Sequence, residues 1–248
     1  MRQGWFAVAI AGVIVSATVL GAAGSEDSRG GESVARLKAG TARFVSNPVD
    51  TAWINAEKRS ALAKGQNPFA TILSCADSRV PPEVIFRAAL GELFVVRAAG
   101  HVTDRTILAS VEYATEHLHV PLIVVMGHES CGAVKAASET PASKSLGPNL
   151  DYVLKAIRPS VAATTSRPET GRLRAAILAN VEETLNEMIS GSTILKTAGR
   201  AGHVAFVGAY YELTTGRVHF SEPVHLLSSE VPSAPRSTTE HQPRGGKQ

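Results

Sequence analysis

Both cysteines of the chain stand in short segments that are rich in reactive side chains. The first segment reads Cys75-Ala76-Asp77-Ser78-Arg79, and the second reads Gly127-His128-Glu129-Ser130-Cys131-Gly132. Two thiolates and one imidazole form a donor set that suits Zn²⁺, and three protein ligands leave a fourth coordination position open, as in catalytic zinc sites. Because His128 and Cys131 are three residues apart, both can face one point as the chain turns into a helix. The sequence therefore offers Cys75, His128 and Cys131 as a candidate zinc site.

Two other interpretations of the cysteines remain open at this point. The N-terminal sequence, described below, predicts export, and a pair of cysteines in an exported protein most often forms a disulfide. Free buried cysteines are the next alternative. The pattern Cys75-x-Asp77-x-Arg79 favours chemistry instead, because an extended chain places these three side chains on one side. A carboxylate with a guanidinium partner beside a thiol has little structural purpose.

The elements that must position these residues follow from hydrophobic periodicity. Continuous apolar runs at 69–74, 93–96, 122–126 and 204–207 predict strands that are buried on both faces. Helical spacing predicts helices at 32–44, 54–64, 103–118 and 171–189. A turn at 214–216 leads into an antiparallel edge strand at 217–220. We expect an α/β fold in a single domain, with a mostly parallel central sheet of four parallel strands and one antiparallel edge strand, flanked by helices. In such sheets ligands bind at the carboxyl ends of strands, where both candidate segments lie.

The two ends of the chain differ in composition from its middle. Arg2 precedes an apolar stretch at 5–20 and the small residues 21–24, which predicts a signal peptide over residues 1–24, with an uncleaved anchor as the alternative. Residues 227–248 are rich in Pro, Ser and Gly and predict a disordered tail. The catalytic domain is expected over 32–226. The protein is expected to be exported, periplasmic or secreted, with no stable membrane insertion after cleavage.

The composition excludes several classes of protein. The chain has 248 residues, of which 44% are hydrophobic and 19% charged, as in ordinary globular proteins. Only 5% of residues are aromatic, and the net charge of +3 is spread along the chain without a Lys/Arg block. No nucleic-acid partner is therefore expected.

The two segments together resemble the β-class carbonic anhydrases. The likeness also includes Arg43-Phe44-Val45, the run Gly91 to Arg97, Ala99-Gly100-His101, Ser110 to Ala114 and Gly208 to Tyr211. It covers roughly residues 32–222. The paired motifs in this order and spacing are highly specific, whereas each alone would be less so.

The resemblance assigns a role to each candidate residue. It implies one Zn²⁺ per chain, held by Cys75, His128 and Cys131, and a catalytic dyad of Asp77 and Arg79. The implied reaction is the reversible hydration of CO₂ to bicarbonate and a proton by attack of zinc-bound hydroxide. Asp77 would accept a hydrogen bond from the hydroxide, while Arg79 keeps Asp77 ionised and oriented. The backbone N–H of Gly132, at a helix start, would donate to a bicarbonate oxygen.

The resemblance also implies self-association and leaves two other functions open. A homodimer or a dimer of dimers is expected, with N-terminal helices at about 32–64 packing on the partner subunit. One alternative function is a hydrolase of CO₂ analogues, carbonyl sulfide or carbon disulfide, on the same fold. The other is a metal-binding or redox module without hydratase activity, which would not need Asp77 and Arg79.

Some positions depart from the family pattern or have no clear assignment. Ala98, Arg87 and Thr41 replace residues that are common in the family, which bears on the subunit interface and the surroundings of the site rather than on the reaction. His101 is a candidate proton shuttle, although a structural role is the simpler interpretation. Glu129, between two candidate ligands, is expected to face solvent or a partner subunit.

Overall fold

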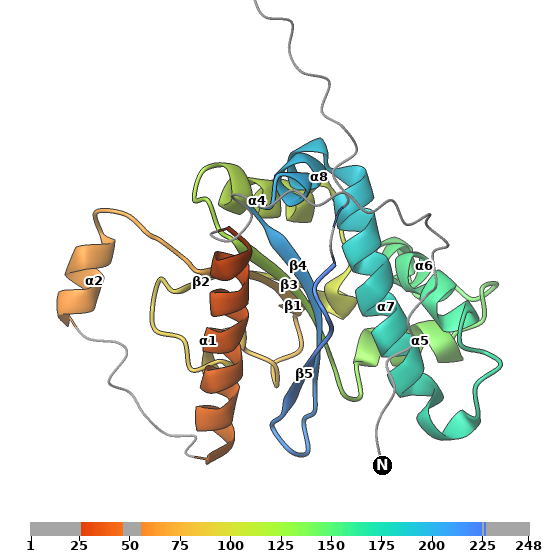
Figure 1. The fold of residues 1–248 in the computed structure, drawn as a ribbon. Helices are drawn as coiled ribbons and strands as arrows, with labels where there is room; N and C mark the ends of the chain where they lie inside the picture. Colours follow the sequence, from red (N-terminus) through yellow and green to blue (C-terminus); the bar gives the residue numbers. More distant parts are fainter. Residues whose placement is uncertain (1–25, 47–55, 225, 227–248) are drawn as a thin grey trace, which may run out of the picture.

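The computed structural model describes residues 26–46, 56–224 and 226, and its centre is a five-stranded sheet (Figure 1). The strand order is β2-β1-β3-β4-β5; the first four are parallel, and β5 pairs antiparallel with β4. The predicted α/β fold class and the antiparallel edge strand are therefore confirmed. The strands are β1 (Ala70–Cys75), β2 (Leu93–Ala98), β3 (Leu122–His128), β4 (Ala205–Tyr211) and β5 (Val218–Phe220).

Helices connect the strands, and most of them lie where periodicity predicts them. The predictions at 32–44, 54–64, 103–118 and 171–189 correspond to α1, α2, α4 and α7, although α1 begins earlier than expected. The helices are α1 (Glu26–Ser46), α2 (Ala56–Leu62), α3 (Pro82–Ile85), α4 (Arg105–Glu116), α5 (Gly132–Glu139), α6 (Pro148–Ala162), α7 (Glu169–Gly191) and α8 (Thr193–Arg200), with a short 3₁₀ turn, η1 (Ala99–His101).

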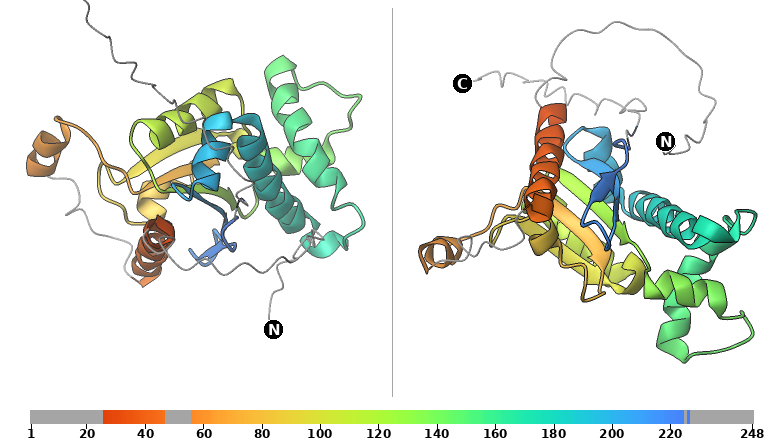
Figure 2. Two further views of the ribbon diagram at one scale, coloured as in Figure 1. Left: turned by 45° about the horizontal axis from the view of Figure 1, so that its top comes forward. Right: turned by 90° about the horizontal axis from the view of Figure 1, so that it is seen from below.

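The two faces of the sheet bury separate apolar layers, as continuous apolar strands require. Strands β1 and β3 are buried along their whole length. One layer joins alternate strand residues to α1, α6 and the first half of α7, and the other joins the intervening residues to α4, α8 and the second half of α7. Figure 2 shows the strands between α1 on one side and α4 on the other. This double cover fixes the strands whose ends carry the candidate ligands.

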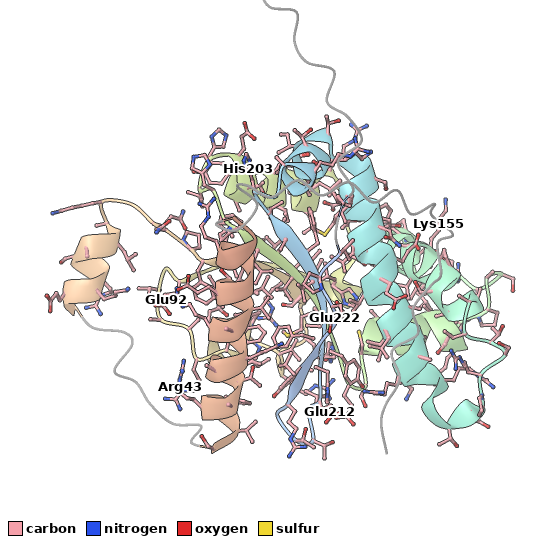
Figure 3. All side chains as sticks on the ribbon, in the orientation of Figure 1. Arg43, Glu92, Lys155, His203, Glu212 and Glu222 are labelled. Atoms are coloured by element: carbon pink, nitrogen blue, oxygen red, sulfur yellow. The ribbon has the colours of Figure 1, made fainter. Side chains whose placement is uncertain are left out.

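Helix α1 packs on its own chain, while α2 stands apart from the sheet. Leu37 of α1 is fully buried, and Gly40 lies so close to α3 that an added Cβ would stand 1.7 Å from the Phe86 carbonyl oxygen. Arg36 donates to Glu92 at 3.2 Å, and Glu92 is seen beside α1 in Figure 3. Most of the described side chains of α2 are exposed. The predicted packing of these helices on a partner subunit stays a prediction.

Several predictions concern residues outside this description. The predicted signal peptide (1–24) and the predicted tail (227–248) lie outside the described residues. Within the described part of the chain, none of the helices combines the length and apolar character needed to span a membrane.

Candidate metal centre

The structure brings the three predicted ligands together at one end of the sheet. Cys75 is the last residue of β1, His128 is the last residue of the adjacent strand β3, and Cys131 directly precedes α5. All three residues are buried, and their ligand atoms lie within 4.8 Å of one another. Cys75 and His128 are 53 positions apart in sequence and meet because β1 and β3 are parallel neighbours that end at the same edge.

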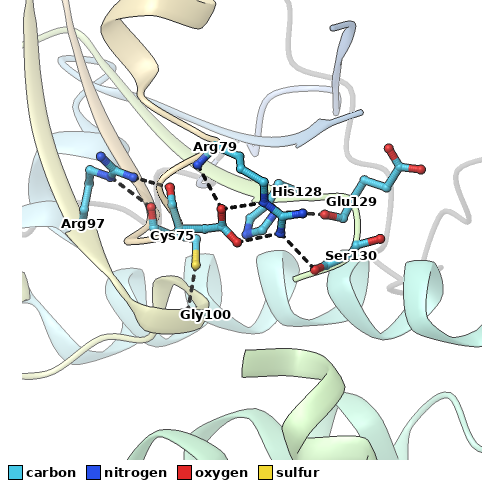
Figure 4. A network of polar contacts seen from close by, with 8 residues as sticks. Cys75, Arg79, Arg97, Gly100, His128, Glu129 and Ser130 are labelled. Carbon is cyan, nitrogen blue, oxygen red and sulfur yellow. Dashed lines mark hydrogen bonds and ion pairs between the residues drawn. The ribbon is translucent and has the colours of Figure 1, made fainter. Parts of the chain in front are cut away.

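The imidazole of His128 is held in an orientation that suits a ligand. Its Nδ1 lies 2.9 Å from the carbonyl oxygen of Glu129, to which it donates in the corresponding tautomer (Figure 4). Its Nε2 is buried and has no hydrogen-bond partner among the described residues. A buried nitrogen without a partner is costly, and a metal ion would remove that cost.

The two thiols complete a donor set that fits Zn²⁺. Cys75 and Cys131 are both free, so the disulfide interpretation is not the arrangement seen here. A hydrogen bond between the two sulfurs lowers the pKa of Cys75 and raises that of Cys131. The backbone N–H of Gly100 also donates to the Cys75 sulfur at 3.3 Å. Two sulfurs and one imidazole nitrogen are the ligands of a catalytic zinc site with one open position.

Asp77 and Arg79 form a bidentate ion pair beside this cluster. Arg79 donates from Nε to Asp77 Oδ1 at 2.8 Å and from Nη2 to Asp77 Oδ2 at 2.7 Å. These hydrogen bonds hold the pKa of the Asp77 carboxyl well below its usual range, so the group is ionised at neutral pH. Arg79 also reaches the Ser130 carbonyl oxygen at 3.4 Å and so touches the segment between His128 and Cys131.

Arg97 and Asn180 support the site but are not found by motif analysis. Arg97, on β2, donates from Nε to the Cys75 carbonyl oxygen at 3.0 Å and from Nη2 to the Asp77 carbonyl oxygen at 2.5 Å. Asn180, on α7, donates to the Gly100 carbonyl oxygen at 2.9 Å. In the sequence, Arg97 directly follows the apolar run 93–96 and ends the Gly91 to Arg97 likeness, which is a signal for this residue. The sequence offers no such signal for Asn180.

His101 has the surroundings of a structural residue rather than a proton shuttle. It is fully buried, and its Nε2 lies 3.0 Å from the side-chain amide of Asn180. Burial lowers the pKa of His101 to about 4, so the ring is neutral near pH 7. A shuttle needs access to solvent, which this side chain lacks. The simpler interpretation of His101 is therefore favoured.

The remaining two site predictions have different outcomes. From the sequence, Glu129 is expected to face solvent or a partner subunit. In the structure its carboxylate is half-buried and accepts hydrogen bonds from both the backbone N–H and the hydroxyl of Thr214, each at 3.0 Å. Gly132 is exposed at the first position of α5, with nothing within 4 Å of an added Cβ. These observations do not test the predicted contact of its backbone N–H with bicarbonate, which stays a prediction.

A separate cavity lies away from this centre. It has a volume of about 640 Å³ and is lined by α1, α8 and the segment that follows β5. None of its lining residues belongs to the cluster described above. The chemistry of the chain therefore centres on the strand ends rather than on this cavity.

Comparison with known proteins agrees with this geometry. The sequence model of the family described as carbonic anhydrase matches residues 70–218, a span that contains every residue of the cluster. Carbonic anhydrase 2 of Mycobacterium tuberculosis is 39% identical over 196 residues, which cover 79% of this chain and 94% of that protein. The chain therefore belongs to the carbonic anhydrase family, in its β class.

Solved structures of the same class share the fold. A β-carbonic anhydrase of Coccomyxa, solved in complex with acetazolamide, is 27% identical and superposes with a TM-score of 0.62, over 71% of this chain and 79% of that chain. A tetrameric β-carbonic anhydrase of the ascomycete Sordaria macrospora is 25% identical, with a TM-score of 0.60 over 78% of this chain and 96% of that chain.

Proposed function

We propose that the protein is a zinc enzyme that catalyses the reversible hydration of carbon dioxide to bicarbonate and a proton. The observation that carries the proposal is the meeting of Cys75, the unpartnered Nε2 of His128 and Cys131 beside an ion-paired aspartate. Membership of the carbonic anhydrase family supports it. A metal-binding or redox module would account for the three ligands but not for Asp77 and Arg79.

The metal that fits is one Zn²⁺ per chain, held by Cys75, His128 and Cys131. When bound, Zn²⁺ lowers the pKa of a water molecule towards about 7 and so supplies a nucleophile near neutral pH. Binding requires both thiols to lose their protons, which the backbone N–H donor at Gly100 favours. The Nδ1 contact with Glu129 leaves the lone pair of His128 Nε2 free for the metal.

The side chains of the dyad orient the reactants. Oδ1 of Asp77 accepts from both the backbone N–H and Nε of Arg79, whereas Oδ2 accepts from Arg79 Nη2 and still has a lone pair available. Asp77 can therefore accept a hydrogen bond from the nucleophile and direct its free lone pair towards CO₂. Arg79 keeps Asp77 ionised and fixes the plane of its carboxylate. We propose that the backbone N–H of Gly132, at the start of α5, donates to an oxygen of bicarbonate.

Stopped-flow measurement of CO₂ hydration on protein of known zinc content tests this function. We expect hydration far above the buffer rate, and little turnover of carbonyl sulfide or carbon disulfide in parallel assays. Turnover of either analogue without CO₂ hydration would replace the proposal by a hydrolase on the same fold. Zinc binding without turnover of any of these substrates would favour the metal-binding module.

We also propose that the protein assembles with itself, as a homodimer or a dimer of dimers. The exposed α2 and the tetrameric Sordaria relative support this proposal. The partner would cover the N-terminal helices.

We further propose that the protein is exported, to the periplasm or the medium. The charged start, apolar stretch and small residues of 1–24 support export. Mass spectrometry of the mature protein should find its first residue between Gly24 and Glu26, whereas an intact Met1 on soluble cytoplasmic protein would contradict export.

A further inference from the structure

The segment between His128 and Cys131 must hold two ligands in fixed positions. It contains Ser130 in a left-handed conformation, with φ of 55°, which is uncommon for a residue other than glycine. Such a conformation persists only where its surroundings enforce it. Contacts with neighbouring elements must therefore hold this segment, here called the ligand loop (residues 128–131).

Backbone contacts fix the first half of the ligand loop. The Glu129 N–H donates to the Tyr211 carbonyl oxygen at 2.8 Å, which extends the pairing of β3 with β4 by one residue. The Glu129 carbonyl oxygen accepts from His128 Nδ1 at 2.9 Å. The position of the Glu129 backbone thus decides the orientation of the imidazole.

The side chain of Glu129 provides a further attachment, to the turn that joins β4 and β5. Its carboxylate accepts from the backbone N–H and the hydroxyl of Thr214, each at 3.0 Å. Figure 4 shows this side chain extending away from the Cys75 thiol, so it is not itself a ligand. The turn has its own support, since the Thr215 hydroxyl donates to Glu212, which is seen at the β4–β5 end of the molecule in Figure 3.

We propose that Glu129 is a positioning residue for the metal centre. Its carboxylate accepts two hydrogen bonds from Thr214 and so attaches the ligand loop to the β4–β5 turn. Two charge-assisted hydrogen bonds on one carboxylate restrain the backbone that orients His128 and leads to Cys131. Contacts of this kind beyond the ligands slow the loss of a bound metal. The inference rests on the ligand set of the proposed function but not on the reaction.

The test measures metal retention rather than turnover. Glu129→Ala removes both hydrogen bonds to Thr214. Thr214→Val removes the hydroxyl hydrogen bond and keeps the one from the backbone N–H, whereas Thr214→Ser retains both. Thr215→Val is the matched control, because it removes the neighbouring hydroxyl of the same turn without touching Glu129. Zinc-loaded proteins are mixed with an excess of a chromophoric chelator, and Co²⁺-substituted samples of the same variants are compared by visible absorption.

We expect Glu129→Ala to release zinc about tenfold faster than the unaltered protein and to shift the Co²⁺ bands. Thr214→Val should have the same effect to a smaller extent, because the Thr214 N–H still donates to Glu129. Thr214→Ser and Thr215→Val should match the unaltered protein. The double variant Glu129→Ala/Thr214→Val should behave like Glu129→Ala alone, since the Thr214 hydroxyl has no carboxylate left to bind once Glu129 is replaced. Unchanged release and bands in Glu129→Ala, or an equal effect of Thr215→Val, would overturn the inference. Zinc retention that follows this pattern in a protein without CO₂ hydration would instead refute only the proposed function.

Discussion

Asp77 is the side chain through which the structure most directly connects the metal cluster to a reaction. It is 18% exposed, follows the Cys75 ligand by two residues, and has both oxygens engaged by Arg79. Its depressed pKa, caused first by the hydrogen bond from Arg79, keeps it ionised as an acceptor throughout the neutral range. These properties suit a group that orients a nucleophile rather than one that donates a proton.

Replacement of this carboxylate tests that role. Asp77→Asn should lower the second-order rate constant of CO₂ hydration by about 100-fold or more, because an amide no longer serves as a charged acceptor. The zinc content should stay at one per chain. Asp151→Asn is the matched control, since Asp151 also has a lowered pKa, from hydrogen bonds with Ser145 and Leu146, but lies outside the cluster. Equal rates for Asp77→Asn and Asp151→Asn would remove Asp77 from the mechanism.

The buried His101 should make the free energy of unfolding depend on pH. Its pKa of about 4 in the folded state lies below the ordinary value of 6.5, so the unfolded state binds more protons between these two values. The free energy of unfolding should therefore fall as the pH decreases from 6.5 to 4, by up to about 1.4 kcal/mol per pH unit from this group.

The variant His101→Asn should show a shallower loss of stability over the same range in urea titrations. Asparagine tolerates the φ of 47° at this position and does not titrate. His119→Asn serves as the control, because His119 has a similar φ of 51° but is exposed. Identical slopes for His101→Asn and the unaltered protein would show that the buried ring does not contribute.

Residue types and spacing identify the proposed metal ligands but not the residues that hold them in place. Cys75, His128 and Cys131 are apparent from the sequence because strand ends and helix starts follow local patterns. Asn180 and Thr214 act through hydrogen bonds to segments that lie about 80 residues away in sequence. Only the tertiary structure brings such partners together, and nothing in their local sequence marks them.

At the scale of elements, Gly40 shows how closely α1 packs against the end of α3. Gly40→Ala would place a methyl group 1.7 Å from the Phe86 carbonyl oxygen, a clash with backbone that no rotamer relieves. We expect a loss of about 3 kcal/mol in the free energy of unfolding, measured with urea on zinc-loaded protein. Gly31→Ala in the same helix meets nothing within 4 Å and should be neutral or stabilising. Equal stabilities of the two variants would contradict this packing of α1.

Elements with strong periodicity are predicted from the sequence, and those with conflicting signals are not. The four parallel strands and α4 follow from apolar runs and from the Asp104 cap, which accepts from the Ile107 N–H at 2.8 Å. Helix α6 contains Pro159, which normally opposes a helix interior, and α8 has only eight residues. Tertiary packing of Leu154 and Leu195, both buried, stabilises these two helices.

At the scale of the whole molecule, α2 is a helix whose described side chains are mostly exposed to solvent in a single chain. Leu62 packs over Gly91, whereas most of the other described α2 side chains are exposed. Sedimentation of the zinc-loaded protein should give the mass of a dimer or a tetramer at micromolar concentration. An active monomer at the same concentration would contradict the proposed assembly.

We propose that the Cys75–His128–Cys131 cluster and the Asp77–Arg79 pair form one zinc-dependent catalytic site for CO₂ hydration. Zinc titration of metal-free protein, followed by stopped-flow CO₂ hydration, tests this claim most directly. We expect a rate that rises in proportion to added zinc and stops rising at one Zn²⁺ per chain. Protein that binds one Zn²⁺ and hydrates CO₂ no faster than buffer with the same zinc would contradict it.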